Sequence, residues 1–254
     1  MSIYLILIPI FFSSMVYGII GFGDAIILIP IITPFIGVIN AVILANLWGT
    51  LTSFLNFIKY REFIDRGYYF RFLFLGIPIT IFGTFLIIGI GLNWIELILG
   101  LFIFMYSILK LYQYCKKTNE IEVKRKLYTK STLIYIGGFT YGFLTALISA
   151  VGPLNVALLE KTGHYRESLI ENFAAIGFAL SIARNPFYFI IGVFPYDLLL
   201  LFLLGFPIIF FGTKLGQEIT LKIPIKTFQV LVFCFLIGIS LKSVITSIFG
   251  LFIQ

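Results

Sequence analysis

Residues 75–86 read LGIPITIFGTFL and residues 204–215 read LGFPIIFFGTKL, so eight of 12 positions are identical at an offset of 129. The same offset pairs Gly23 with Gly152 and Asn56 with Asn185. Matches of Ile and Phe carry little information in so apolar a chain, but matches of Gly, Pro, Thr and Asn do. Two copies of one apolar unit predict a transporter, because a duplicated helical bundle can rock around a shared central site.

The composition indicates an all-α, polytopic membrane protein in contact with membrane lipid. The chain has 254 residues, of which 60% are hydrophobic and 11% are charged, whereas soluble domains carry about a quarter charged residues. Apolar runs of about 20 residues follow one another along the whole chain. The net charge of +7 comes from Lys and Arg in short loops, where they set membrane orientation. It is therefore no indication of nucleic-acid binding.

About 8–10 helical segments are expected, in two repeats. The first repeat spans 1–113, a basic linker spans 114–131, and the second repeat spans 132–254. The expected segments are 3–21, 24–38, 41–58, 69–91 and 94–113, then 132–151, 153–160, 168–190, 197–215 and 226–250.

In each repeat a glycine turn separates the first two segments, and the segment after the turn is short. The turns lie at residues 21–24 and 150–153, and Pro30 and Pro34 are expected to interrupt the first short segment. About 15 helical residues reach only about 22 Å, less than a 30 Å hydrocarbon core. Such pieces need protein or a cavity around them. Each repeat then has five crossings, or three crossings and a re-entrant hairpin.

Loop charges predict that the two repeats are inserted upside down relative to each other. The loop after the third segment is basic, with Lys59, Arg61 and Arg66, whereas its counterpart around 192–198 carries only Asp197. The positive-inside rule places the first loop and the basic linker in the cytoplasm and the second loop outside. Both chain ends are then outside a cell membrane. The N-terminus lacks a basic stretch, so no cleaved signal peptide is expected.

The glycine turns resemble those of the TauE/SafE (sulfite exporter) family of membrane permeases. The motif-bearing stretches are GIIGFGDAIILIP at 18–30, the glycines between 138 and 142, SAVGPLN at 149–155 and YRES at 165–168. The resemblance covers nearly the whole chain and implies transport of sulfite or an organosulfonate. Asp24 stands where members of this family usually carry glycine.

The two turns are candidate binding sites for a small oxyanion. A helix start leaves several backbone N–H groups unpaired and adds partial positive charge. Glycine lets a ligand approach the backbone, and proline suits a first helical position. The alternative is that the glycines only allow close helix packing. The candidate residues at the turns are Gly21, Gly23, Asp24, Gly152, Pro153 and Asn155.

Asp24 and Arg184 are the ionisable residues of interest within apolar segments. Asp24 is expected either to cap the helix that starts at Ala25 or to carry a proton, since desolvation favours the neutral acid. Arg184 offers a rigid fork of donors for an oxyanion, or it snorkels to the outer interface.

A polar stripe and a pair of equivalent asparagines complete the candidate site. Asn46, Thr50 and Ser53 share one helix face, which should be turned toward protein or water. Asn56 and Asn185 occupy equivalent positions in the two repeats. Hydrogen bonding between helices is the alternative function of all these residues.

Three functions are compared. The leading one is secondary-active transport of a small anion by alternating access, with coupling to protons as an option. The alternative is a proton-coupled carrier of a neutral or cationic solute that uses Asp24. The third is an intramembrane aspartyl protease, which would use Asp24 in Gly21-Phe22-Gly23-Asp24 together with Asp197 in Tyr196-Asp197. These two motifs occur here in the reverse of the order found in such proteases, so no enzyme is expected.

No cofactor or metal is expected from the remaining motifs. The two cysteines, Cys115 and Cys234, do not form a metal-ligand pattern, and no phosphate-binding Walker loop is present. His164 is expected in a solvated cytoplasmic loop. The sequence does not decide whether the protein forms a homo-oligomer.

Overall fold

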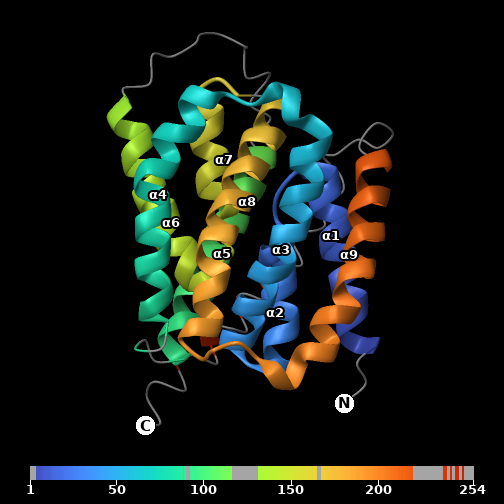
Figure 1. Cartoon of the computed structure of the whole chain (residues 1–254). Helices are drawn as coiled ribbons and strands as arrows, with labels where there is room; N and C mark the ends of the chain where they lie inside the picture. Colours follow the sequence, from blue (N-terminus) through green and yellow to red (C-terminus); the bar gives the residue numbers. More distant parts are fainter. Residues whose placement is uncertain are drawn as a thin grey trace.

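The computed structural model describes residues 4–87, 89, 92–115, 131–164 and 167–219, and single positions between 237 and 248. Over these ranges the chain forms α-helices and short 3-10 turns and contains no strand, which confirms the predicted all-α class (Figure 1). The linker at 116–130 and nearly all of the tenth expected segment, 226–250, lie outside the described residues.

The helices follow the order of the expected apolar segments. The first half contains α1 (Tyr4–Ile20), α2 (Asp24–Ile36), α3 (Val38–Tyr60), α4 (Arg66–Leu86) and α5 (Leu92–Cys115). The second half contains α6 (Ser131–Ile148), α7 (Gly152–Lys161), α8 (Glu167–Ile190) and α9 (Leu199–Ile219). The 3-10 turns η1 (Arg61–Phe63) and η2 (Tyr196–Leu198) precede α4 and α9. In the described chain, five spans are long and apolar enough to cross a membrane.

The two short helices lie inside the bundle. α2 has 13 residues and α7 has 10, so they reach only about 20 Å and about 15 Å. In Figure 1, α2 occupies the lower half of the bundle and α7 the upper half. The expected interruption of α2 is wrong, because the helix continues through both Pro30 and Pro34. Proline costs least near a helix start or end, and neighbouring helices can satisfy the freed carbonyls.

Glycines set the close packing of two helix pairs. On α6, a Cβ added to Gly138 would lie 2.2 Å from the backbone oxygen of Phe72 on α4. On α1, a Cβ added to Gly18 would lie 2.3 Å from the backbone oxygen of Thr213 on α9. Small residues at such interfaces let membrane helices approach closely. The two copies of the repeated stretch thus lie at these close contacts. Residues 75–86 belong to α4, which packs on α6, and residues 204–215 belong to α9, which packs on α1.

Helix contacts keep the same pattern when the two halves are exchanged. Helix α4 packs on α6 and on α8, while the equivalent α9 packs on α1 and on α3. Helices α3 and α8 pack on each other in the middle of the bundle. In Figure 1 the α3–α4 connection lies at the top of the view and the equivalent α8–α9 connection at the bottom. The inverted insertion of the two halves itself stays a prediction.

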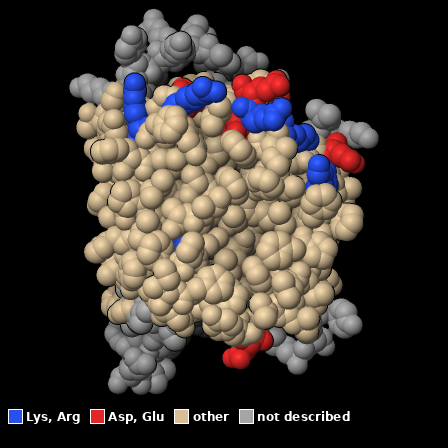
Figure 2. Space-filling view, viewed as in Figure 1, with Lys and Arg blue, Asp and Glu red and all other residues tan. Residues whose placement is uncertain are grey.

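Charged side chains gather at one end of the molecule. Figure 2 shows Lys and Arg along the upper edge, above a broad uncharged belt. The exposed basic residues of the described chain come from connections and helix ends at this end: Lys59, Arg61, Arg66, Arg71, Lys161 and Lys214. An uncharged belt with exposed Phe and Leu side chains is the surface that lipid requires.

Candidate functional site

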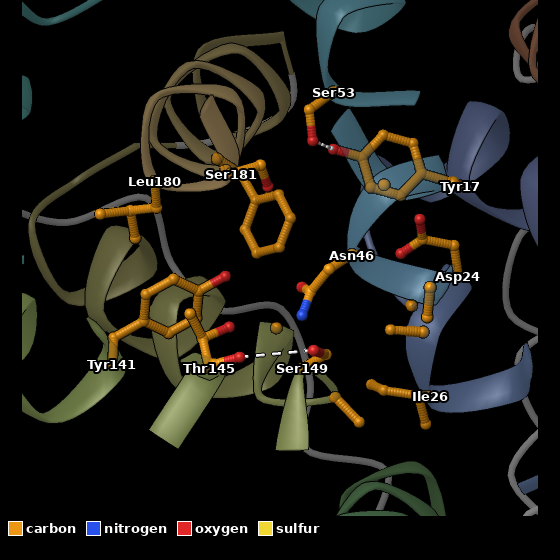
Figure 3. Close-up of a pocket in the computed structure, with 18 of the residues that line it drawn as sticks. Tyr17, Asp24, Ile26, Asn46, Ser53, Tyr141, Thr145, Ser149, Leu180 and Ser181 are labelled. Atoms are coloured by element: carbon orange, nitrogen blue, oxygen red, sulfur yellow. Dashed lines mark hydrogen bonds between the residues drawn. The ribbon is translucent and has the colours of Figure 1, made fainter. Parts of the chain in front are cut away.

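A cavity of about 60 Å³ lies in the middle of the bundle, where both glycine turns meet (Figure 3). Its walls come from α1, α2, α3, α6, α7 and α8. A volume of this size admits a few water molecules or one small solute. The polar residues that line it are Tyr17, Asp24, Asn46, Ser53, Tyr141, Thr145, Ser149, Ser181 and Arg184.

The first glycine turn places an acid on the cavity wall. Gly23 adopts a left-handed conformation with φ of 96°, which favours glycine, and α2 begins at the next residue. The helix therefore begins at Asp24, one residue before the expected start at Ala25, and Gly23 is its N-cap residue. The Asp24 carboxylate nevertheless accepts a hydrogen bond from the backbone N–H of Ala25, as expected of an acid at a helix start. Asp24 is half-buried, and its Oδ2 accepts a hydrogen bond from the Thr52 hydroxyl at 3.1 Å.

The second turn brings a helix start without an acid to the same cavity. Ser149 has a positive φ of 55°, and α7 begins at Gly152 with proline in its first turn. At the offset of 129, Pro153 is the counterpart of Asp24. A Cβ on Gly152 would lie 3.3 Å from the Phe173 ring, so glycine keeps this helix start open to the cavity. Gly152 borders the cavity, whereas Pro153 has no N–H and the Leu154 N–H donates to the Val151 carbonyl, so this helix start presents the Gly152 backbone to the cavity.

Arg184 is buried on α8 and lines the cavity. Its side chain is 4% exposed, so it does not snorkel to an interface. One terminal nitrogen donates to the Thr145 carbonyl at 2.5 Å and the other donates to Oδ1 of Asn46. Its Nε has no hydrogen-bond partner. Among the described residues, no Asp or Glu forms an ion pair with this guanidinium. The cavity therefore contains a buried cation that forms no ion pair with a carboxylate of the described chain, although Asp24 lines the same cavity.

The polar stripe of α3 faces protein. The Asn46 amide donates to the Tyr188 hydroxyl at 2.6 Å, and Asn185 donates to the Thr50 hydroxyl at 2.8 Å. Ser53 shares a 2.9 Å hydrogen bond with the Tyr17 hydroxyl, as Figure 3 shows. The stripe thus joins α3 to α8 and α1, and it holds both Asn46 and Arg184 in place.

The cavity brings together six of the predicted site residues. These are Gly23, Asp24, Asn46, Ser53, Gly152 and Arg184. The cavity lining does not include Gly21, Thr50, Asn56, Pro153, Asn155 and Asn185.

The residues outside the lining hold helices together. A Cβ on Gly21 would lie 2.8 Å from the Ile170 side chain. Asn56 accepts a hydrogen bond from Gln217 at 2.7 Å, and Asn155 accepts one from the Tyr68 hydroxyl at 3.4 Å. For these residues, hydrogen bonding and packing between helices is the role that the structure supports.

Hydroxyl-bearing residues of α1 and α6 were missed in the sequence. Tyr17 and Tyr141 both line the cavity, and each directly precedes a glycine that packs against another helix, Gly18 or Gly142. The two Tyr-Gly pairs are 124 residues apart, so an ungapped comparison at 129 does not align them. A comparison that allows a gap before the glycine turn would have found this signal.

His164 is buried, and the expected solvated position is wrong. The ring is 6% exposed, lies 5.0 Å from the Tyr68 ring and accepts or donates a 2.8 Å hydrogen bond at Thr162. Its Nε2 lies 3.4 Å from Oδ2 of Asp65, the residue that caps α4. Burial lowers the pKa of His164, and Asp65 only partly offsets this effect. Packing against α4, which the local sequence does not reveal, removes the ring from water.

The described residues form no metal-binding cluster, and the two acids considered for a protease lie apart from each other in the fold. No group of three or more His, Cys, Asp and Glu residues lies close enough to hold a metal ion within the described ranges. Asp24 lines the cavity, whereas Asp197 lies in η2 and does not. The carboxyl pair that an aspartyl protease requires is therefore not formed by these two residues.

Comparison with known proteins agrees with the transporter architecture. The model of the family described as "Sulfite exporter TauE/SafE" matches residues 6–243, which is nearly the whole chain. No curated protein and no solved structure matches the chain. With a family match over this length, the helical bundle and the central cavity belong to a membrane transporter, and the chain is a member of the sulfite exporter TauE/SafE family.

Proposed function

We propose that this protein is a secondary-active permease of the cell membrane that moves a small anion, either a sulfur-containing oxyanion or an organosulfonate. Membership of the TauE/SafE family supports the class of solute. The positive-inside rule supports a cytoplasmic position for the basic end that Figure 2 shows.

The observation that carries this proposal is the buried Arg184 guanidinium on the cavity wall. A buried ion without a counter-ion costs several kcal/mol, and a bound anion would offset that cost. The unpartnered Nε of Arg184 and the backbone N–H of Gly152, which lines the cavity at the start of α7, are donors of the kind that an oxyanion accepts. The two terminal nitrogens are already held by Thr145 and Asn46, which keeps the guanidinium in one orientation.

Alternating access around the cavity is the transport mechanism that we infer. One glycine turn reaches the cavity from each half of the chain. In Figure 1 the short helices that follow the turns point to opposite ends of the bundle. Rocking of the α1–α9 and α4–α6 pairs against the central α3–α8 pair would open the cavity to one end at a time.

Transport by reconstituted protein tests the proposal. Purified protein in liposomes would be assayed with sulfite, a short alkylsulfonate, acetate and a neutral alcohol. We expect saturable uptake of sulfite or the sulfonate, and a loss of at least about tenfold in Arg184→Ala, which corresponds to about 1.4 kcal/mol. Arg61→Ala, which removes an exposed cation from η1, is the matched control and should transport normally. Uptake of none of the anions, or equal uptake by Arg184→Ala, would reject the proposal.

A second candidate function rests on Asp24. The cavity wall carries a carboxylate as well as a cation, which suits a proton-coupled carrier of a neutral or cationic solute. In that case Asp24 would bind the solute or the proton. The neutral alcohol and a small amine in the same assay test this function, because only the second candidate predicts their saturable uptake.

A further inference from the structure

A second carboxyl group, Glu171 of α8, is buried outside the cavity lining. The residue is 0% exposed, and neither carboxylate oxygen has a hydrogen-bond partner. No described cation forms an ion pair with it. This differs from Asp24, which accepts a hydrogen bond from Thr52.

Glu171 lies between the basic end of the bundle and the cavity. The residue that follows it, Asn172, accepts a hydrogen bond from the backbone N–H of Asp65 and donates one to the Phe63 carbonyl, so this turn of α8 is attached to the connection before α4. Phe173, two residues after Glu171, lines the cavity. Glu171 is therefore enclosed by protein in the stretch of α8 that joins the basic end to the cavity.

Tyr17 packs next to the turn of α8 that carries Glu171. Its hydroxyl is hydrogen-bonded to Ser53, and its ring lies on the cavity wall next to Asp24 in Figure 3. The same ring lies 6.4 Å from the ring of Phe173, which comes two residues after Glu171. The turn of α8 that carries Glu171 is therefore adjacent to a residue of the cavity wall.

Burial without partners selects the protonated form of Glu171 in this conformation. An ionised carboxylate with no hydrogen bond and no counter-ion costs several kcal/mol in such a place, whereas the neutral acid costs less. Most charged groups of the elements around this turn are exposed to solvent. They are Lys59 of α3, Arg61 and Glu62 of η1, Asp65 and Arg66 at the start of α4, Lys161 of α7 and Glu167 of α8. Glu160 of α7 is half-buried, and the titratable His164 after α7 is buried.

We propose that Glu171 is a proton-binding site that couples transport to protons. It binds a proton while the basic end of the bundle is closed, and it releases that proton when opening of this end brings water to the carboxylate. A proton then acts as a ligand that favours the closed state, because it binds that state better. The coupling part of this proposal rests on the proposed permease function, whereas the protonation part does not.

Infrared spectroscopy of the full-length protein tests protonation without any knowledge of the solute. At neutral pH we expect the carbonyl stretching band of a buried carboxylic acid in the wild type and in Asp24→Asn. Glu171→Gln should remove that band in both backgrounds. Glu167→Gln changes an exposed acid one helical turn earlier and should keep the band. A spectrum of Glu171→Gln that is identical to the wild type would overturn the proposal.

Transport measurements test coupling. In liposomes, Glu171→Gln should keep the exchange of labelled for unlabelled anion and should lose the stimulation of uptake by a proton gradient. Glu167→Gln should keep both. Equal stimulation in Glu171→Gln and wild type would overturn coupling. A wild type that transports no anion would reject the permease function, and the infrared result would still decide protonation. If Glu171→Gln does not fold, Glu171→Leu carries the same tests, because it breaks no hydrogen bond.

Discussion

At the scale of single residues, the cavity combines an acid and a cation that come from different halves of the chain. Asp24 enters from α2 and Arg184 from α8. The sequence indicated both, because an ionisable residue inside an apolar segment is costly and therefore informative. Their common cavity could not be predicted, since it depends on how α2 and α8 pack in three dimensions.

Replacement of Asp24 distinguishes its alternative roles. In Asp24→Asn we expect the anion to bind at least about tenfold more tightly, because two like unit charges about 4 Å apart repel by about 4 kcal/mol at an effective dielectric constant of about 20. Titration of the purified protein with sulfite, followed by its thermal unfolding temperature, measures this change.

Thr52→Val is the control for the Asp24 experiment, since it removes the hydrogen bond to Asp24 and keeps the charge. Weaker anion binding in Asp24→Asn would contradict the expectation. Loss of pH dependence alone in this variant would assign Asp24 to proton coupling, and loss of amine binding would assign it to a cationic solute.

His164 gives the folded protein a defined pH dependence. Burial lowers its pKa below the ordinary value of about 6.5, so the unfolded chain binds a proton more readily than the folded chain. The contribution of His164 to the free energy of unfolding is therefore complete above pH 6.5 and is lost as the pH falls toward the folded-state pKa. Since the chain contains one histidine, thermal unfolding of wild type and His164→Gln between pH 7.5 and about 5 isolates this effect.

The His164→Gln comparison has a clear contrary result. We expect the unfolding temperature of the wild type to fall more steeply below pH 6.5 than that of the variant. Parallel curves for the two proteins would show that the imidazole does not titrate with folding.

At the scale of elements, glycine positions decide which helices touch. The sequence predicted the turns and the short helices from glycine and apolar length, and the structure contains both. Glycines within helices were harder to interpret, because their role depends on the partner helix. A Cβ on Gly138 would lie 2.2 Å from the backbone of Phe72 on α4, whereas a Cβ on Gly76 of the same interface would lie 3.4 Å from the end of the Leu180 side chain and 3.6 Å from the Gly138 carbonyl oxygen, which are ordinary contact distances.

This difference predicts unequal effects of alanine at one interface. Gly138→Ala places a methyl group against a backbone oxygen that cannot turn away, so the free energy of unfolding should fall by about 1–3 kcal/mol. Gly76→Ala should change it little, because a leucine methyl can move. Unfolding of both variants in detergent, followed by circular dichroism, compares them directly. Equal losses would mean that glycine at 138 is not required for close contact of α4 and α6.

At the scale of the whole molecule, the sequence predicted the helix order and the family. It predicted some of the residues that line the cavity and missed others. Internal repetition located the equivalent helices because Gly, Pro and Thr recur at one offset. The first helices of the two halves keep a different offset, since the pairs Tyr17-Gly18 and Tyr141-Gly142 are 124 residues apart. The cavity tyrosines were missed for that reason. Burial of His164 was missed because it depends on contact with α4.

The inverted arrangement is open to a direct test with impermeant thiol reagents. In a chain with Cys115 and Cys234 replaced, we expect Arg61→Cys to react only after the cell membrane is permeabilised. Tyr196→Cys, at an exposed position in η2, should react in intact cells. Arg61 belongs to the α3–α4 connection at the top of Figure 1, the end at which Figure 2 shows the Lys and Arg side chains, which is why the positive-inside rule predicts this result. Modification of both positions from the same side would contradict the inverted duplication.

Asp24 in one turn and Pro153 in the other occupy equivalent positions of the two repeats, so the two repeats differ chemically at the cavity. If alternating access exposes one turn to each face, a solute from one face first meets the Asp24 carboxylate. A solute from the other face then first meets the backbone at Gly152. The half-saturating concentrations measured from the two faces should therefore differ. For uncoupled flux, microscopic reversibility still requires the ratio of maximal rate to half-saturation to be equal from both faces, so tighter uptake on one side is accompanied by a slower maximal rate there.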